Sequence, residues 1–360
     1  MAGVLRILGI VVVVLLVAVG GFYFFGPKTA SRSQTLEIPR PAPVVLARLA
    51  STPVGSTVVP GVTVSAAPTT TGDTVVAPVA FADGATGQVT YRVTAQGEGS
   101  NVNVKLEQNL GANPLNRIDA LTGGDVSPLI ATAASAVEAD LTALPNADFE
   151  GLVYNVEEVT ARPFFFAQSC VQNEPDSITN LVSDAVVAIT PLMRQRGLTQ
   201  AGPLMAVEPR VVNEQYCFQI GYPYSGRAPG QVLGNLFQSG QTPSGRVLHV
   251  HYTGSEADVV PQVYDRLDAL LGAARLDNPA TREDDWVTYE VYNDDPTQSG
   301  GSRNREIYYV VPANVDIAPV QALLAPGAAA VTETPAAATT TSTDTATTTA
   351  TTTATATTTP

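Results

Sequence analysis

Three segments in the first half of the chain alternate between apolar and polar residues: 74–80, 88–95 and 101–108. In the last two, three alternate positions are apolar, from Val89 to Val93 and from Val102 to Leu106, the pattern of strands with one buried face. The stretch Gly97–Ser100 lies between them and favours a hairpin. We therefore expect an antiparallel sheet in this part of the chain.

Two helices are predicted to accompany this sheet. Residues 41–50 carry four apolar side chains on one side, and Ser127 followed by Pro128 is a good helix start. The second helix, of about seventeen residues, has one apolar stripe: Ile130, Ala133, Val137, Leu141 and Leu144. With a short strand at 35–38, these elements predict an α+β domain over residues 35–148.

The second half of the chain repeats one order of elements. An apolar strand at 164–171 precedes a long amphipathic helix between Asp176 and Gly197, and strands at 204–208 and 214–221 follow. A strand at 246–252, a helix from about Asp258, and strands at 286–292 and 305–311 repeat that order. We therefore predict two βαββ units.

Two βαββ units can pair into one antiparallel sheet that carries both helices on the same face. The other face is then left without helical cover. A groove between the halves is the expected binding place for a ligand. We predict that this domain spans residues 150–312.

The N-terminal segment predicts a membrane anchor over residues 1–27. Residues 7–25 contain no charge and would reach about 28 Å as a helix, close to the hydrocarbon thickness of a bilayer. The aromatic residues 22–25 suit the bilayer interface. The alternative is a cleaved signal peptide ending near Gly20. The lipid bilayer is thus an expected partner, through residues 7–25.

Charges give a divided prediction for orientation. Arg6 precedes the span, whereas Lys28, Arg32 and Arg40 follow it, which favours a cytoplasmic location for the rest of the chain. The short N-terminal tail and the acidic, Thr-rich remainder favour the outer side. We expect a single-pass protein of a bacterial inner membrane with a periplasmic soluble part, and a cytoplasmic one is the alternative.

The C-terminal segment has the composition of a disordered tail. Thr332 to Pro360 contains 17 threonines in 29 residues, mixed with alanine and only two acidic residues. No packed core can form from such a composition. We expect a disordered tail over residues 325–360, serving as a plain tail, a spacer or a glycosylated stalk.

Composition excludes several functions. The 360 residues include 33 acidic and 19 basic side chains, a formal net charge of −14, which argues against nucleic acid as a partner. Two cysteines, Cys170 and Cys217, cannot build a Cys-rich zinc site or an iron–sulfur cluster. We found no serine-hydrolase, P-loop or dinucleotide fingerprint, and we expect no cofactor and no metal.

Part of the first region is similar to a known family. The stretches "SQTLEIPRPAPVVLARL" and "VTYRVTAQGEGSNVNVKLEQNLGANPLNRI", with the closing helix, resemble the START-like (SRPBCC, polyketide cyclase-like) family. That resemblance implies a helix-grip fold, in which a sheet wraps around a long C-terminal helix. Residues 51–88 are shorter than the cavity-lining segment usual in that family. The first domain could therefore contain a working ligand cavity or have a purely structural role.

The second region resembles the GyrI-like small-molecule-binding domain, also found as the effector-binding half of AraC-type and multidrug-sensing regulators. The resemblance rests on "RVLHVHYTGSEADVVPQVYDRLDALL", on "DDWVTYEVYNDDP" and on "NREIYYVV". Its best motif comprises Glu290 and Tyr292, followed by Glu306, Ile307 and Tyr308. The resemblance implies a ligand groove whose acid corresponds to Glu290.

Strand alternation places Trp286, Thr288, Glu290 and Tyr292 on one face and Val287, Tyr289 and Val291 on the other. We expect the second set to lie under the helices and the first to line the open groove. Aromatic faces beside a carboxylate suit an organic cation. The predicted ligand-binding residues are Trp286, Glu290, Tyr292, Tyr252 and Tyr308.

Histidine and cysteine leave further alternatives. His249 and His251 share a strand face and could supply two metal ligands, although hydrogen-bonded histidines are the simpler interpretation. Cys170 and Cys217 could pair as a disulfide or stay as buried thiols. Acidic groups at 283–285 and 294–295 read as solvated loops.

We therefore predict a membrane-anchored protein that binds a small cationic or aromatic molecule and is not an enzyme. One alternative is a hydrolase in which Glu290 acts on an electrophilic ligand. Another is an envelope scaffold or protein-interaction module, whose protein partner the sequence does not identify. The absence of a preceding helix-turn-helix argues against a DNA-binding regulator.

Overall fold

The structure is a computed structural model. It describes residue 21 and residues 27–111, 117, 126–172, 175–212, 215–227, 237–276, 286–297 and 302–323. Contacts group all of the described residues into one compact unit, within Met1–Leu323. The predicted tail, residues 325–360, and the acidic group 283–285 lie outside the described residues.

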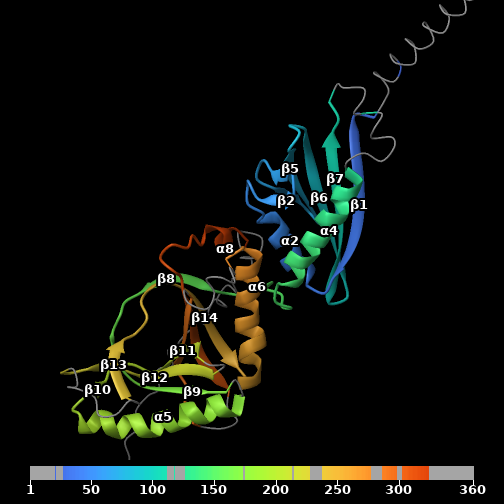
Figure 1. The fold of residues 1–360 in the computed structure, drawn as a ribbon. Helices are drawn as coiled ribbons and strands as arrows, with labels where there is room; N and C mark the ends of the chain where they lie inside the picture. Colours follow the sequence, from blue (N-terminus) through green and yellow to red (C-terminus); the bar gives the residue numbers. More distant parts are fainter. Residues whose placement is uncertain are drawn as a thin grey trace, which may run out of the picture. The chain divides into compact units, whose positions relative to one another are not determined.

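The first sheet has seven strands in the order β1-β7-β6-β5-β3-β2, with β4 paired to β5, and every pair is antiparallel (Figure 1). Two helices accompany it, α2 (Ala42–Ala50) and α4 (Val126–Thr142). The strands are β1 (Thr29–Ile38), β2 (Thr57–Val59), β3 (Val62–Val64), β4 (Thr69–Thr71), β5 (Thr74–Phe81), β6 (Thr86–Gln96) and β7 (Gly99–Asn109).

Strand alternation predicted the buried face of this sheet correctly. The side chains of Val89, Tyr91 and Val93 on β6 are buried, and so is every second side chain of β7 from Val102 to Leu106. Helix α4 contacts β1 and β7. Its buried residues include the predicted stripe residues Ile130, Ala133, Val137 and Leu141.

The short strands β2, β3 and β4 were not predicted. They lie in a stretch where proline, glycine and threonine interrupt any long alternation, and each contains only three residues. Pairing with a neighbour, rather than local propensity, sets such short strands.

The second sheet has nine antiparallel strands in the order β13-β9-β12-β11-β15-β16-β14-β8, with β10 paired to β12. Its helices are α5 (Pro175–Gln195) and α6 (Asp265–Ala273), and α6 continues a π-helical turn at Val260–Tyr264. The strands are β8 (Asn155–Val159), β9 (Pro163–Val171), β10 (Thr199–Gln200), β11 (Leu204–Val212), β12 (Gln215–Ser225), β13 (Phe237–Gln241), β14 (Gly245–Gly254), β15 (Val287–Tyr292) and β16 (Arg303–Val310).

The repeated order of elements is present in this sheet. One half runs β9, α5, β11 and β12, and the other runs β14, α6, β15 and β16. The halves join through β11 and β15, which pair over four positions from Leu204–Tyr292 to Val207–Tyr289. The mixed α+β class and the antiparallel sheets are therefore confirmed, and the boundary between residues 148 and 150 stays a prediction.

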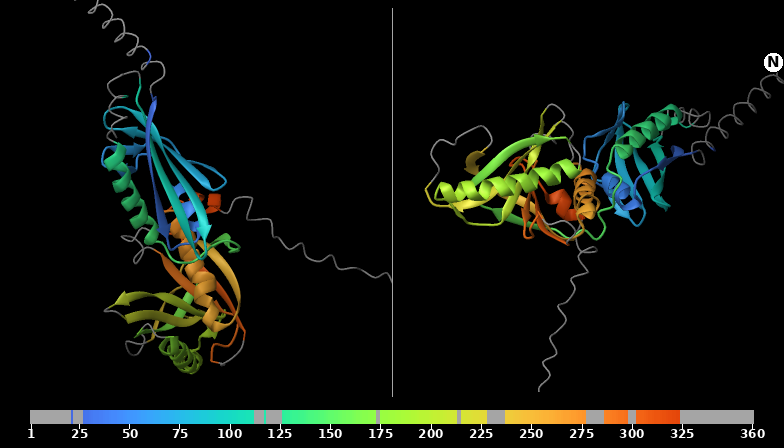
Figure 2. Two further views of the ribbon diagram at one scale, coloured as in Figure 1. Left: turned by 90° about the vertical axis from the view of Figure 1, so that its right-hand side faces the viewer. Right: turned by 90° about the horizontal axis from the view of Figure 1, so that it is seen from below.

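The two faces of the second sheet differ in what packs on them. One cluster joins α5 side chains such as Val182 and Ile189 to strand residues including Phe165 and Tyr292. Figure 2 shows α5 lying along one side of the strands. The other cluster, which we term the strand-only face, takes its members from β9, β11, β15 and β16: Phe164, Phe166, Met205, Val207, Tyr289, Val291, Tyr308 and Val310.

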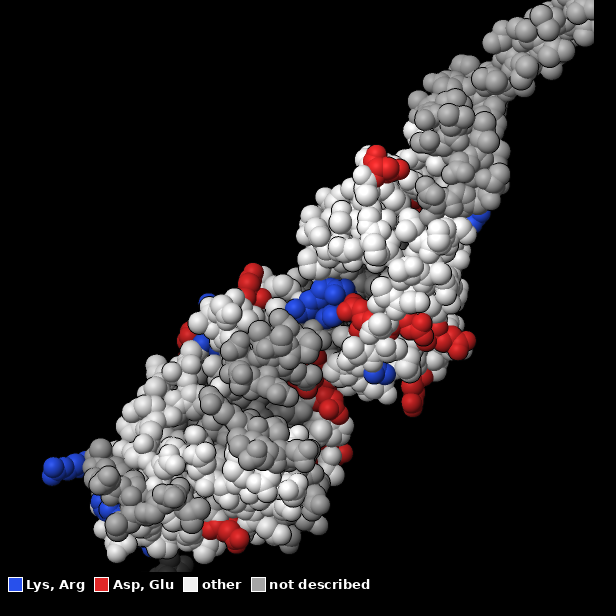
Figure 3. Space-filling view, in the orientation of Figure 1, with Lys and Arg blue, Asp and Glu red and all other residues white. Residues whose placement is uncertain are grey.

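Among the described residues, no helix is long and apolar enough to cross a bilayer. The predicted span at 7–25 lies outside the described residues except for Gly21. On the face shown in Figure 3, charged side chains form small groups between wide uncharged areas. That appearance agrees with a sequence in which only 14% of residues are charged.

One short extra helix, α8 (Ala318–Leu323), follows the second sheet, with Val320 buried.

Candidate functional site

Strand β15 presents the opposite faces from those we predicted. Tyr289 and Val291 belong to the strand-only face, whereas Tyr292 packs in the cluster under α5. Glu290 also points toward helical residues, because the Tyr264 hydroxyl from the turn before α6 donates to it. The expectation that Glu290 and Tyr292 line the open face is therefore wrong. Aromatic residues occur on both faces of this strand, so alternation alone could not tell which face the helices cover.

Glu290 lies in a buried ion pair. Its side chain is 14% exposed, and the Arg305 Nη1 group donates to Oε2 at 2.9 Å. The Tyr264 hydroxyl donates to the other oxygen, Oε1, at 2.7 Å. Both carboxylate oxygens thus have protein partners, and a neighbouring guanidinium balances the negative charge.

Arg305 connects several side chains on the helix-covered face. Its Nη2 group donates to Glu256 Oε2 at 2.6 Å, and its guanidinium lies 4.3 Å from the centre of the Tyr292 ring. Burial alone would lower the pKa of Arg305, but Tyr292, Glu290 and Glu256 raise it well above its ordinary value. Burial, followed by Glu290, likewise raises the pKa of Tyr292. The cluster is thus a fixed ion-pair network.

Sequence reasoning missed the two arginines of this network. Arg303 also lies near Glu256 and donates to Asp294 Oδ2 at 3.2 Å. Both arginines are buried, although arginine is rarely fully buried unless it is paired. Arg303 and Arg305 are two residues apart and alternate with the same period as Ile307 and Tyr309 on β16. That alternation could have predicted that both arginines lie on the buried face of the strand.

The remaining predicted site residues lie in different places. Tyr252 is opposite Arg305 in the β14–β16 register, and its hydroxyl donates to the Ser255 carbonyl at 2.7 Å. Burial raises the pKa of Tyr252. Trp286 precedes β15 and is half-buried. Tyr252, Glu290 and Tyr292 therefore share the helix-covered face, and Tyr308 is on the strand-only face.

Three rings stack in a row across the strand-only face. The rings of His249 and Tyr308 are 4.4 Å apart with an interplanar angle of 8°. Those of Tyr308 and Tyr289 are 4.5 Å apart at 10°. The row follows the sheet register, in which β14, β16 and β15 place these residues directly opposite one another.

Charged side chains act on the two tyrosine hydroxyls. Burial, then Glu157 and Glu306, raise the pKa of Tyr308 to about 12, while Arg162 acts in the opposite direction. Burial is also the main cause that raises the pKa of Tyr289, followed by Tyr308 and Glu157. Both hydroxyls therefore stay protonated at neutral pH. They can donate hydrogen bonds beside buried apolar side chains such as Phe164 and Met205.

The two histidines are held by carboxylates. His249 and His251 both bond to Glu306, through Nε2 at 2.7 Å and Nδ1 at 2.9 Å respectively. Within the described ranges, no group of three or more His, Cys, Asp and Glu residues could hold a metal ion. Of the loop acids, Asp294 accepts from Arg303, and Asp295 accepts from the Thr297 backbone and hydroxyl, so both have structural partners.

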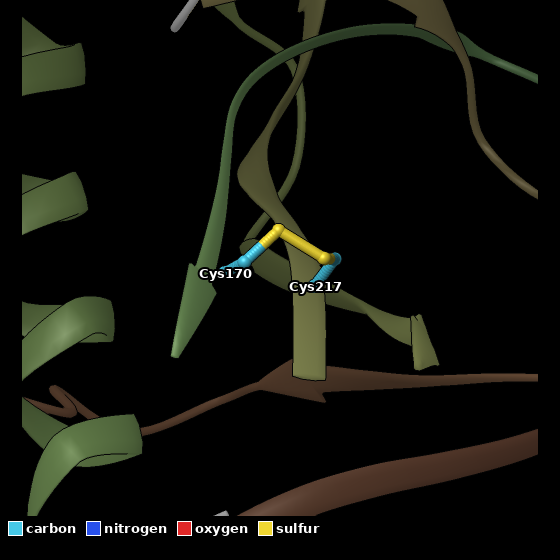
Figure 4. The surroundings of a disulfide bond; sticks show 2 residues. All are labelled: Cys170 and Cys217. Carbon is cyan, nitrogen blue, oxygen red and sulfur yellow. A yellow bond between two sulfur atoms is a disulfide. The ribbon is translucent and has the colours of Figure 1, made fainter. Parts of the chain in front are cut away.

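Cys170 and Cys217 form a disulfide between β9 and β12 (Figure 4). The two residues are directly opposite each other in the strand register, which places both side chains on one face of the sheet. Of the two alternatives that the sequence left open, the structure shows the disulfide.

Comparisons with known proteins found similarity only at the level of solved structures. No family model matches the chain, and no curated protein matches it. SAV2435 bound to tetraphenylphosphonium is 9% identical, with 45% of this chain and 95% of that one covered at a TM-score of 0.33. A hydrolase from Listeria innocua is 12% identical over 45% of this chain and 91% of its own, with a TM-score of 0.29.

A third structure covers more of the chain. DynU16, a protein encoded in the dynemicin biosynthetic locus, is 11% identical over 82% of this chain and 93% of its own, at a TM-score of 0.23. Identities and scores this low do not transfer a function.

Proposed function

We propose that this protein binds a small, largely aromatic molecule on the strand-only face of its second sheet, with cations preferred. The observation that carries this proposal is the row of stacked rings His249, Tyr308 and Tyr289 beside the apolar side chains of that face. Six of the eight side chains of that face are at most 9% exposed, so they would form the floor of the site, and the partly exposed rings of Tyr308 and His249 would contact the ligand.

Charge favours a cation over an anion. Glu157 and Glu306 both act on the Tyr308 hydroxyl, and Arg162 opposes them. The chain as a whole has a formal net charge of −14. Because both carboxylates also pair with His249, the attraction for a positively charged aromatic molecule comes from the net negative charge of the wider surface.

Glu290 has a different role in this proposal from the one that the sequence suggested. A cationic ligand at Glu290 would compete with Arg305, whose guanidinium already neutralises that carboxylate at 2.9 Å. The hydrolase alternative meets the same obstacle, because both oxygens of Glu290 accept hydrogen bonds from the protein. Of the five predicted ligand-binding residues, the proposal keeps Tyr308.

The test uses two probes of nearly equal shape and opposite charge, tetraphenylphosphonium and tetraphenylborate. A ligand at about 100 times its Kd stabilises the folded protein by ~2.7 kcal/mol. For a domain of this size that is a rise in Tm of roughly 5–10 °C. We expect such a rise with tetraphenylphosphonium and a smaller one, or none, with tetraphenylborate.

Two variants locate the site. Tyr308→Leu removes the central ring of the stack, and we expect it to abolish the rise in Tm with tetraphenylphosphonium. Glu290→Gln should lower the starting Tm and leave the rise intact. A rise that survives in Tyr308→Leu and disappears in Glu290→Gln would refute the strand-only face and restore the sequence-based site.

We also propose that the soluble part lies outside the cytoplasm, on the periplasmic side of a bacterial inner membrane, held by a span at residues 7–25. The support is the Cys170–Cys217 disulfide, since such bonds persist mainly in oxidising compartments. A topology reporter fused after Val311 and thiol labelling of the two cysteines in intact cells test the location. Reactive thiols with a cytoplasmic reporter signal would overturn it, and release of the full-length chain by a salt wash would overturn the anchor.

A further inference from the structure

Both ring nitrogens of His249 contact carboxylates. Nδ1 lies 2.7 Å from Glu157 Oε1, and Nε2 lies 2.7 Å from Glu306 Oε2. An ionised carboxylate only accepts hydrogen bonds, so each nitrogen must carry a proton to bond to it. A neutral imidazole has one N–H group. With both carboxylates ionised, the two contacts together favour the imidazolium form of His249.

The surroundings of the ring also suit a positive charge. His249 has a side chain only 16% exposed and lies parallel to the Tyr308 ring, whose face attracts cations. His251, on the same strand, shares Glu306 with it. Farther along the face, Tyr289 extends the stack, and Arg162 acts on both tyrosine hydroxyls.

The two carboxylates are held to different degrees. Glu306 has a side chain 20% exposed and also accepts from His251 and from the Asn293 amide. Burial alone would raise the pKa of Glu306, but the two histidines hold it below its ordinary value. Glu157 is 43% exposed, and among the described residues its ion-pair contact is with His249. If the ring loses a proton, the contact with Glu157 is the weaker of the two.

Glu157 belongs to an edge strand. Strand β8 ends the order of the second sheet and pairs with β14 over five residues. Its other charged contact, Glu158 with Arg246 at 3.5 Å, is between side chains 69% and 52% exposed. Exposed ion pairs contribute little. Of the two charged side-chain contacts described for β8, the one between Glu157 and His249 is therefore the stronger.

We propose that His249 is a proton-dependent fastener that ties strand β8 to the sheet. In the imidazolium form the ring bonds to Glu157 on β8 and to Glu306 on β16. Loss of one proton leaves the bond to Glu306 and releases Glu157, so β8 opens more often as the pH rises. Because Glu157 acts on the Tyr308 and Tyr289 hydroxyls, opening uncovers the polar end of the strand-only face; this last consequence rests on the proposed function.

The protonation state is tested by 15N NMR of the full chain with labelled histidine. The chain has two histidines, so His251→Gln leaves the His249 ring as the single signal. At about pH 5.5, below the ordinary imidazole pKa of about 6.5, we expect the two similar 15N shifts of an imidazolium. The widely split pair of a neutral ring at that pH would overturn the proposal.

The movement of β8 is tested by hydrogen exchange at about pH 5.5 and about pH 8.5, corrected for the intrinsic rates. We expect the protection factors of the β8 amides to be about tenfold lower at about pH 8.5 than at about pH 5.5. A tenfold change corresponds to the loss of about one charge-assisted hydrogen bond. Glu157→Gln should give the lower protection at both values. The matched change on the neighbouring residue, Glu158→Gln, should behave as the unaltered protein does.

Equal β8 protection at the two pH values, or a pH-dependent fall that persists in Glu157→Gln, would overturn the fastener. These readings contain no ligand, so they are independent of the proposed function. Tetraphenylphosphonium binding is measured separately at both pH values. Binding that fails while the fastener is observed refutes the proposed function alone.

Discussion

The ion pair between Arg305 and Glu290 predicts a large and specific effect of one substitution, Arg305→Met. The guanidinium is buried and holds three neighbours: Glu290, Glu256 and the ring of Tyr292. Methionine fills a similar length of apolar space but carries no charge. The protein then keeps the carboxylates and loses the cation that balances them.

The cost falls mainly on Glu290. Glu256 is 47% exposed and remains close to Arg303, so water and that arginine compensate its charge. Glu290 keeps the hydrogen bond from Tyr264 and its contact with the Tyr292 hydroxyl, and is otherwise a buried carboxylate. Removing one partner of a buried ion pair costs ~3–5 kcal/mol. We expect about 3 kcal/mol for Arg305→Met, because Tyr264 still stabilises the carboxylate.

The assay is urea unfolding followed by the fluorescence of Trp286. It is the chain's single tryptophan and immediately precedes β15, so it reports on the second sheet. The double variant Arg305→Met with Glu290→Gln removes the unbalanced charge and should recover about 2 kcal/mol, a typical coupling between contacting residues. Arg246→Met, at an exposed ion pair, is the control and should change the free energy of unfolding by less than about 0.5 kcal/mol.

A cost below about 1 kcal/mol for Arg305→Met would refute the reasoning, since it would mean that the pair is solvated or absent. Strictly additive costs in the double variant would refute it as well. Either result would also make Glu290 available again as a ligand-binding or catalytic acid.

Three further predictions concern other contacts. The Cys170–Cys217 disulfide joins residues 47 positions apart, so reducing it should lower the free energy of unfolding by up to about 4 kcal/mol. Urea titrations with and without reductant measure this difference, and equal unfolding midpoints would contradict it. Because the pKa of Glu306 is lowered in the folded protein, its contribution to stability is present above the ordinary pKa of glutamate and is lost as the pH falls through the lowered value. Glu306→Gln should therefore flatten the acid side of a plot of Tm against pH. The same acid slope in the variant and the unaltered protein would contradict this prediction. Gly221→Ala should destabilise the second sheet by more than about 2 kcal/mol, because the Cβ of the new alanine would lie 2.0 Å from the Phe165 carbonyl oxygen. An unchanged Tm would show that β9 and β12 can separate at this position.

Much of the fold could be predicted from periodicity. The long strands β6, β7 and β9 and the helices α4 and α5 have continuous apolar patterns, and the structure places each within a few residues of the prediction. The three-residue strands could not be found this way, since their order comes from pairing with β5 or with each other. Alternation along the sequence reports only on neighbouring residues, whereas strand pairing depends on residues that are distant in the sequence.

The candidate site was predicted less well, for a related reason. Alternation correctly separated Glu290 and Tyr292 from Tyr289 and Val291, but it carries no information about which set the helices cover. The contacts of Tyr264 with Glu290, and of α5 side chains with Tyr292, decide that question. The partner of Glu290, Arg305, lies 15 residues away and on another strand, so only the register of β15 with β16 brings them together.

The short pairing between β11 and β15 has a consequence for how the duplicated halves behave as rigid pieces. The pairing covers four positions, and β11 shifts register against β12 immediately after Val207, where that pairing ends. The backbone thus joins the halves over a short seam, and side chains from both halves pack together on each side of it. A change of twist at Ala206 or Val207 would therefore have to move packed side chains of both halves together.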